Sequence, residues 1–410
     1  SLDACLCRGS HGSSDGHRGS PSAGMGHLGA LVKFAFTDEQ RMLWDTSQAF
    51  LADTSSSRAV RMACASDRGF DDALWRRVCD DMYWQGILVP EDNDGLGLGW
   101  VEMVIVLEAA GERLLTSPLF AVAQSAAALT QCPKTACRDA LFGSILAGDI
   151  VALALSNPSS DWHCVDARVD TSEGVTHLSG EAGFVSCGYA AEHVLVAAHN
   201  ADDTLSLWCI NPSQEGVRIE RTPTMDQTRP MAHLYMDAVT VSNEQCLLAD
   251  ANEWFNRTLA LSRILTVADQ VGIAQASLDV SVAYTKERSQ FDRTIASFQA
   301  IKHKAADMML KVESARSLLY YAACTVDAWS VGQVNDEALL EAAYMASACA
   351  SDAAFFNAGS GIQMHGGVGI TEEYDIQLYF KRARATESFL GRPSDMRESL
   401  ASQLLDGAAP

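Results

Sequence analysis

Apolar residues recur at helical spacing in the first part of the chain and predict a helical N-terminal region. The stretch TDEQRMLWDTSQAFLAD starts at Thr37 with an N-cap residue and an acidic first turn, and its apolar positions then follow a helical period. Residues 99–114 and 117–131 are two further apolar stretches of helical length. The segment VPEDNDGLGLG, residues 89–99, contains proline and glycines that break any helix.

The pattern changes from about residue 150 to residue 248. Here short runs rich in β-branched residues are separated by Gly, Pro, Asn and Asp. These runs are VTHLSG, HVLVAAH, TLSLWCI, GVRIERT and HLYMDAVTV. They predict a compact antiparallel β unit, either a barrel or a sandwich.

The helical period returns from about residue 250. Residues 253–288 contain no proline and only one glycine, which indicates one long helix, and two more long helices follow at 298–329 and 335–367. The expected fold class is therefore α+β. We expect an N-terminal helical domain at 33–149, a middle β domain at 150–248 and a C-terminal four-helix bundle at 249–405.

Residues 1–32 are expected to form a tail without a fold of their own. Their first 30 residues are rich in Gly and Ser and lack the apolar middle of a signal peptide. We interpret the tail as disordered or vector-derived, with Met25 as a possible natural start. The twelve cysteines of the chain are scattered, and the closest pair within the predicted domains, Cys132 and Cys137, has no companion at ligand spacing. We therefore expect reduced thiols in a cytoplasmic protein and no metal site.

The charge balance limits the partners of the chain. Its 410 residues include 30 Lys and Arg against 52 Asp and Glu, a formal net charge of −22. Such an acidic surface argues against nucleic acid and anionic membranes as general partners. No apolar run reaches the roughly 20 residues that a membrane-spanning helix needs. A polyanionic ligand such as a CoA ester could still bind through local Arg, Lys and helix N-termini.

The stretch RSQFDRTIASFQ, residues 288–299, is the first candidate for chemistry. Arg288 stands where the long predicted helix ends, and its guanidinium fork matches phosphate in a bidentate way. Phe291 and Phe298 offer flat apolar faces to a ring, and Gln299 can both donate to and accept from an adenine edge. The structural alternative is that Arg288 complements the helix dipole while the phenylalanines fill the core.

The second candidate is GIQMHGGVGIT, residues 361–371. Gly366, Gly367 and Gly369 have no Cβ, so the backbone can approach a ligand closely and direct N–H groups at phosphate. This is not the dinucleotide-binding fingerprint, because no strand precedes it and its spacing differs. Taken alone, such a stretch is more often a turn that ends a helix, and a histidine such as His365 is more often packed or exposed than catalytic.

The two stretches together resemble the acyl-CoA dehydrogenase family. The shared motifs are Arg-x-Gln-Phe before a bundle helix and Gln-x-His-Gly-Gly-x-Gly further along the chain. The resemblance extends from FTDEQRML to GRPSDMRESLASQLL, and VPEDNDGLGLG is similar to a loop of that family. It implies an FAD cofactor, an acyl-CoA substrate, an electron-transfer flavoprotein as the electron acceptor, and a flavin site shared between two subunits.

Carried over residue by residue, the resemblance assigns one half of the flavin site to the helices and the other to the β unit. The helical half would reach the diphosphate and adenine of a flavin held mainly by the neighbouring subunit, and it comprises Arg288, Gln290, Phe291, Phe298, Gln299, Gln363, Gly366 and Gly367. In the β unit, Leu155 and Ser156 would lie along the isoalloxazine, and Phe184 and Ser186 near its N5. This second half departs from the family pattern, since Asn157 replaces the usual acid.

The family's catalytic base is missing at both of its usual positions. The reaction removes a proton α to a thioester, which requires a carboxylate. In most members this is a Glu directly before a Gly in the last helical segment, but here Leu390 precedes Gly391. The alternative family position, on the long helix, corresponds to Ser262. Asp269 and Glu387 remain as nearby carboxylates, and Asp269 is either a base or a structural acid paired with an arginine.

The C-terminal FLGRPSDMRESLA resembles divergent dehydrogenase subunits of bacterial pathways for sterol side chains and dicarboxylates. Those subunits often form α2β2 heterotetramers in which one subunit carries the base. The resemblance implies that this chain is the subunit without the usual catalytic Glu. Two alternatives stay open: a self-sufficient homo-oligomer that uses Asp269 as its base, and a flavin-free scaffold without catalysis of its own.

Overall fold

The N-terminal part of the protein is helical, as predicted. The computed structural model describes residues 36–159, 161–162 and 164–406, so the predicted tail at 1–32 lies outside the described residues. The first helix begins directly after Thr37, whose side chain and that of Gln40 form a reciprocal capping box. The helices of this part are α1 (Asp38–Thr54), α2 (Ser57–Ala65), α3 (Asp72–Arg77), α4 (Trp100–Glu112), α5 (Leu119–Thr130) and α6 (Ala136–Leu146). Short 3-10 turns at Trp84–Gly86 and Glu91–Asn93 and a π turn at Val78–Met82 connect α3 to α4.

One eight-stranded sheet forms the middle of the chain. Its strands are β1 (Val151–Ala154), β2 (Arg168–Ser172), β3 (Val175–Ser186), β4 (His193–His199), β5 (Leu205–Ile210), β6 (Val217–Thr222), β7 (Met231–Val241) and β8 (Cys246–Leu248). The order is β6-β7-β3-β2-β4-β5-β8, with β1 paired to β4 outside this path.

The expected antiparallel barrel or sandwich needs a correction, because this sheet is mixed. β1 pairs with β4 in parallel from Val151 opposite His193, and β2 also meets β4 in parallel. The pairings among the described strands do not close into a barrel, since β6 and β8 end the path without pairing to each other. The predicted runs correspond to β3–β7. The sequence analysis predicted neither β1, β2 and β8 nor the long connections that bring β1 and β2 beside β4 in the same direction.

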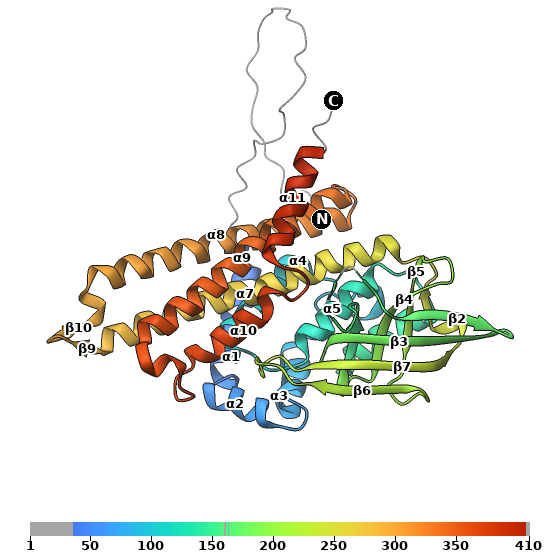
Figure 1. Cartoon of the computed structure of the whole chain (residues 1–410), viewed down its shortest axis with the longest axis horizontal. Coiled ribbons are helices and arrows are strands. Elements are labelled where there is room, and N and C mark those ends of the chain that lie inside the picture. Colours follow the sequence, from blue (N-terminus) through green and yellow to red (C-terminus); the bar gives the residue numbers. More distant parts are fainter. Residues whose placement is uncertain (1–35, 160, 163, 407–410) are drawn as a thin grey trace, which may run out of the picture. The chain divides into compact units, whose positions relative to one another are not determined.

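The C-terminal part is a bundle of long helices. These are α7 (Asn252–Glu287), α8 (Gln299–Ser330), α9 (Asp336–His365), α10 (Ile376–Glu387) and α11 (Pro393–Asp406), and a two-stranded hairpin, β9 (Ser289–Gln290) with β10 (Arg293–Thr294), joins α7 to α8. The single long helix predicted for residues 253–288 is confirmed by α7. α7, α8 and α9 pack against one another, and α10 and α11 pack on α9 (Figure 1).

Helix α4 joins the N-terminal helices to the bundle through an unusually close crossing with α7. A Cβ placed on Gly272 would lie 2.2 Å from the carbonyl oxygen of Glu108, and one on Gly111 would lie 2.4 Å from that of Asp269. Only glycine allows two helix backbones to approach this closely. The crossing therefore fixes the position of Asp269 relative to α4.

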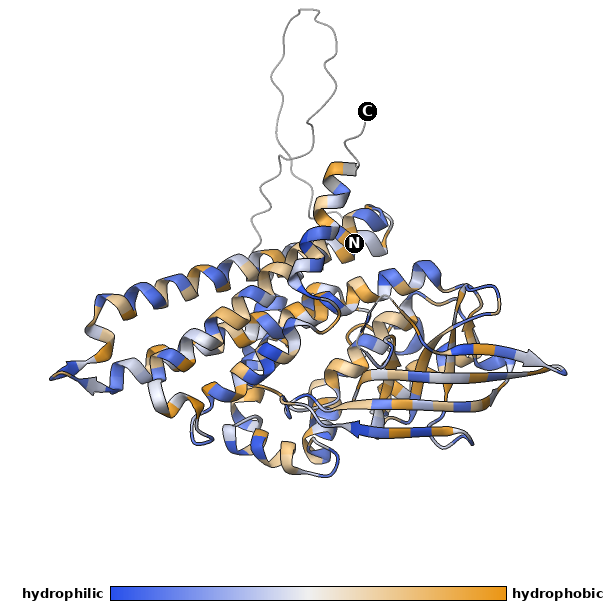
Figure 2. Cartoon of the chain, in the orientation of Figure 1, coloured by the Kyte–Doolittle hydropathy of each residue, from blue (hydrophilic) through white to orange (hydrophobic). Residues whose placement is uncertain are grey.

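The hydropathy of the residues follows this architecture. In Figure 2, hydrophobic and hydrophilic residues alternate along α8 and along β3 and β7, so each element has an apolar side and a polar side. Helices α4 and α5 are buried along almost their whole length. Among the described residues, no helix is both long enough and apolar enough to cross a membrane.

Candidate flavin and acyl-CoA site

The hairpin between α7 and α8 presents Arg288, Gln290 and Phe291 to solvent. Two residues at its tip, Phe291 and Asp292, have positive φ angles of 55° and 60°, as in the tight turns that match the twist of two-residue hairpins. The backbone carbonyl of Arg288 accepts a hydrogen bond of 2.8 Å from Ile295 N. The Phe291 side chain is 86 % exposed, so it does not fill the core.

The start of α8 adds Phe298 and Gln299 to this end of the bundle. The rings of Phe291 and Phe298 meet edge to face with centroids 6.2 Å apart. The guanidinium of Arg293 lies 3.9 Å from the centroid of Phe298. Gln299 is exposed at the first position of the helix. The hairpin and the start of α8 therefore form one exposed surface of amide, aromatic and guanidinium groups.

The C-terminal end of α9 reaches the same end of the bundle. Gln363, Gly366 and Gly367 are exposed there, and a Cβ on either glycine would meet open space. His365 is buried instead, since its ring stacks on Tyr284 of α7 at 4.3 Å and its Nδ1 lies 2.7 Å from the carbonyl oxygen of Gly361. Burial lowers the pKa of His365 below its ordinary value. His365 thus anchors α9 one turn before the end of α7.

These groups fit the phosphates and adenine of a dinucleotide. The side chain of Arg288 is exposed and forms no hydrogen bond or ion pair within the described part of the chain, so its fork is free for an anion. The open space around Gly366 and Gly367 allows a ligand to approach the backbone. The structure thus brings the helical half of the predicted site together.

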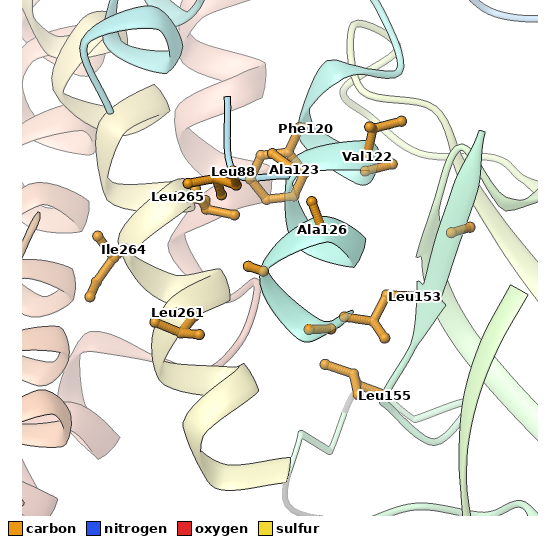
Figure 3. Close-up of a cluster of buried hydrophobic side chains, with 14 of the residues drawn as sticks. Leu88, Phe120, Val122, Ala123, Ala126, Leu153, Leu155, Leu261, Ile264 and Leu265 are labelled. Atoms are coloured by element: carbon orange, nitrogen blue, oxygen red, sulfur yellow. The ribbon is translucent and has the colours of Figure 1, made fainter. Parts of the chain in front are cut away.

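The β half of the predicted site is arranged differently. Leu155 is buried among apolar side chains of β1, α5 and α7, in the cluster drawn in Figure 3. Ser156 is buried and donates a hydrogen bond of 2.8 Å to the carbonyl oxygen of Gly183. The hydroxyl of Ser186 points to the sulfur of Met231 at 3.6 Å. Both hydroxyls therefore already have partners inside the protein.

Aromatic side chains fill the space in front of this half. Trp162 is buried and meets Phe389 edge to face at 5.0 Å, and it lies 6.3 Å from Phe184. Phe389 in turn lies 6.0 Å from Phe120 of α5. Because Phe389 directly precedes Leu390, this aromatic cluster occupies the region between the β half and the expected position of the base.

Asp269 belongs to a buried network of alternating charges. Its two carboxylate oxygens lie 2.8 Å from Arg229 and 2.9 Å from Arg382. Arg382 also reaches Asp226 at 2.9 Å and donates to the hydroxyl and the carbonyl oxygen of Thr228. The adjoining cavity measures only about 20 Å³. Each oxygen of Asp269 therefore faces a guanidinium, and this geometry favours the structural alternative over a free base.

The two family positions for the base carry no carboxylate, and both side chains are buried. Leu390 and Ser262 are each about 1 % exposed. Glu387 lies on the last turn of α10 and forms an ion pair with Arg384. Among the described residues at these positions, the structure therefore offers no unpaired carboxylate.

Sequence reasoning missed the partners of these residues. Arg229 and Asp226 precede β7 and lie far from Asp269 along the chain, so no helical spacing connects them. Trp162 lies five residues after Asn157, which is the departure from the family pattern noted above. Neither a buried Asp-x-x-Arg nor a single tryptophan has a periodicity that would predict these contacts.

Two family models cover most of the folded chain. The N-terminal domain of acyl-CoA dehydrogenase matches residues 37–149, and its C-terminal domain matches residues 253–405. A relative from Mycolicibacterium smegmatis, acyl-CoA dehydrogenase IpdE2, is 31 % identical over 368 residues, which are 90 % of this chain and 99 % of the relative. The chain belongs to the acyl-CoA dehydrogenase family.

Solved structures of this family have the same fold. A variant of the Tcur3481-Tcur3483 steroid ACAD is 26 % identical with a TM-score of 0.82, over 91 % of this chain and 99 % of that one. The ChsE4-ChsE5 complex from Mycobacterium tuberculosis gives a TM-score of 0.83 at 23 % identity, over 92 % and 100 % of the two chains. This acyl-CoA dehydrogenase is thus an FAD-dependent oxidoreductase that acts on acyl-CoA.

Proposed function

We propose that this acyl-CoA dehydrogenase chain is the subunit without the catalytic base in a heteromeric enzyme. It would contribute Arg288, Gln290, Gln299 and the Gly366–Gly367 pair to a flavin held mainly by its partner. The observation that carries this proposal is the contrast between the two halves of the site. In the helical half, Arg288, Gln299 and the Gly366–Gly367 pair are exposed. In the β half, Leu155, Ser156 and Ser186 are buried, and Trp162 lies beside the half-buried Phe184.

The chemistry that bound FAD supplies is the acceptance of the hydride that leaves the β carbon of the acyl thioester. In this proposal, the residues of this chain bind the flavin and do not transfer protons. Arg288 would neutralise phosphate charge, Gln299 would pair with an adenine edge, and Phe291 and Phe298 would cover apolar ring faces. A carboxylate of the partner would remove the α proton, because Leu390 cannot accept one.

Two grooves between α8 and α9 support an oligomer. One has a volume of about 490 Å³, and it starts at Gln363 and passes Phe355 and Phe356. The other continues along the same helices past Leu310 and Met345. An apolar groove next to a predicted shared-site residue fits a family partner chain, which would bring its own flavin to Gln363.

The substrate that we propose is a bulky acyl-CoA of the steroid-derived kind, with an electron-transfer flavoprotein as the electron acceptor. The support is the similarity to the steroid ACAD above, and to a chain in a structure of the electron transferring flavoprotein of Acidaminococcus fermentans at 25 % identity and a TM-score of 0.81. A homo-oligomer that uses Asp269 as base and a flavin-free scaffold are the rival proposals.

Co-expression separates the three. The chain is purified alone and together with the acyl-CoA dehydrogenase-like gene beside its own, and FAD per chain and the mass of the assembly are measured. Our proposal expects a yellow mixed complex with one FAD for each pair of unlike chains, and a colourless or insoluble single chain. A yellow homo-oligomer that acyl-CoA bleaches would instead support the proposal that Asp269 is the base. A mixed complex whose FAD content per partner chain equals that of the partner alone would support the proposal of a flavin-free scaffold.

A further inference from the structure

A small polar cavity lies between α7, α9 and the loop that joins α10 to α11. Its wall includes Arg263 from α7, Ser347 and Ser351 from α9 and Glu387 at the end of α10, and Leu390 and Gly391 close it from the loop. Its volume is about 10 Å³. That is roughly the space of one water molecule, so a chloride-sized ion fits only if a flexible wall side chain such as Met396 moves outward.

Arg263 brings an uncompensated positive charge to this cavity. Its side chain is about 3 % exposed, Nε donates to the carbonyl oxygen of Leu390 at 2.8 Å, and the Tyr344 ring lies 5.4 Å from Cζ. Its Nη2 has no hydrogen-bond partner among the described residues. A Cβ on Gly391, in the cavity wall, would lie 3.7 Å from this Nη2, so the free donor faces the cavity.

The other buried arginines of the described chain have an acidic partner, which Arg263 lacks. Arg138, Arg229 and Arg382 each form an ion pair with an aspartate. Arg263 has no such partner within the described residues, although burial lowers its pKa and Tyr344 only partly opposes this. An arginine keeps its proton at neutral pH even when it is buried. Glu387 also lines the cavity, but its carboxylate pairs with Arg384 and forms no ion pair with Arg263 within the described residues. The charge of Arg263 therefore calls for a further counter-ion.

Two hydroxyls converge on the same cavity. Ser347 and Ser351 are one helical turn apart on α9, and they therefore share a face of that helix. The Oγ atoms of both are buried and lack hydrogen-bond partners among the described residues. A serine hydroxyl can donate to an anion as well as to water. The cavity thus collects three unpartnered donors, one of which is charged.

The charge distinguishes the two possible occupants. A water molecule could satisfy the hydroxyls, but it would leave the buried guanidinium without a counter-charge. We propose that this cavity binds a small inorganic anion of about the size of chloride, held by Arg263, Ser347 and Ser351. This site does not depend on the flavin role of the chain, because none of its three donors belongs to the predicted flavin residues.

The test compares thermal unfolding of the full chain, in the assembly in which it is purified, in sodium chloride and in sodium gluconate of equal ionic strength. Gluconate is too large for the cavity. We expect the midpoint to rise with chloride and to saturate, since an anion that binds only the folded state stabilises it by mass action. The variant Ser347→Ala combined with Ser351→Ala should need about tenfold more chloride for half of the effect, because it removes two donors to a charged ligand.

Arg263→Gln should abolish the chloride response, whereas Arg257→Gln should keep it. Arg257 is a matched control, since it lies on the same helix and pairs at the surface with Glu253 and Asp336. If Arg263→Gln does not fold, the double serine variant still decides the question. Equal midpoints in both salts, or a double serine variant that responds like the native chain, would mean that the cavity holds only water and would overturn the proposal.

Discussion

Asp269 lies between two buried guanidinium groups, and this arrangement makes its role testable. Asp269→Asn would leave Arg229 and Arg382 with Asp226 as their only acidic partner in the network, so one buried charge would be uncompensated. We expect a loss of about 3–5 kcal/mol in the free energy of unfolding, measured by denaturant titration. Asp279→Asn on the exposed side of α7, where Asp279 contacts Gln275, is the control and should change stability little.

The rival interpretation of Asp269 predicts a different result from the same variant. A general base would be replaced at little cost in stability, and the variant would keep the native fold but lose reduction of the flavin by acyl-CoA. Native-like unfolding together with abolished reduction would therefore assign the base to this chain.

Arg288 is predicted to bind flavin phosphate across a subunit interface. Arg288→Ala should lower the FAD content of the assembled enzyme about tenfold or more, since a charge-assisted bidentate contact is lost, while the unfolding midpoint of the flavin-free protein stays unchanged. Lys286→Ala removes the same charge two residues earlier on the same exposed turn and should retain FAD. Equal flavin content in both variants would reject the role of Arg288.

Glu112, at the end of α4, gives the protein a pH dependence. Burial raises the pKa of Glu112 from 4.5 to about 7, against the opposing hydrogen bond from Gln48. The folded state then holds a proton that the unfolded state releases, so stability should fall as the pH rises from about 4.5 to about 7. Glu112→Gln should remove about 1–3 kcal/mol of this fall, as read from unfolding titrations across that range. The exposed Glu215→Gln is the control, and a fall of the same size in the Glu112 variant would contradict the assignment.

At the scale of elements, the crossing of α4 and α7 depends on two glycines. Gly272→Ala should destabilise the protein by several kcal/mol, roughly the range of severe overpacking, because the new methyl group meets backbone rather than a side chain that could move. Gly143→Ala is the matched control, since a Cβ there meets nothing within 4 Å in the middle of α6. It should stabilise by about 0.5–1 kcal/mol. Calorimetry on the two variants measures both changes in the free energy of unfolding. An unchanged stability of Gly272→Ala would show that α4 and α7 can move apart to accommodate the methyl group.

The elements themselves were largely readable from the sequence. The capping box at Thr37 and the absence of proline from residues 253–288 are local signals, and both helices begin and end close to the predicted positions. Strands β1 and β2 and their directions were not predicted from the sequence. They depend on pairing with β4 across long connections, which leave no periodicity in the strands themselves.

The predicted site shows the same limit. Arg288, Gln299 and the Gly366–Gly367 pair were predicted because their motifs resemble those of the family, and each of them also lies next to a helix end. The contacts of Trp162 with Phe389 and of Arg229 with Asp269 join segments that only the tertiary fold brings together. For this reason the sequence indicated that the β half of the flavin site departs from the family pattern, but it did not predict which side chains pack there.

At the scale of the whole molecule, the network of Asp226, Arg229, Asp269 and Arg382 connects the segment before β7 with α7 and α10. If the sheet separated from the bundle, these four buried charged side chains would lose their ion-pair partners together. A partly unfolded state in which the sheet has separated from the bundle should therefore be high in free energy. We expect the sheet and the helices to unfold in a single cooperative step. In hydrogen exchange, the amides of β7 and of the middle of α7 should then open together, as one unit, although they belong to different parts of the chain.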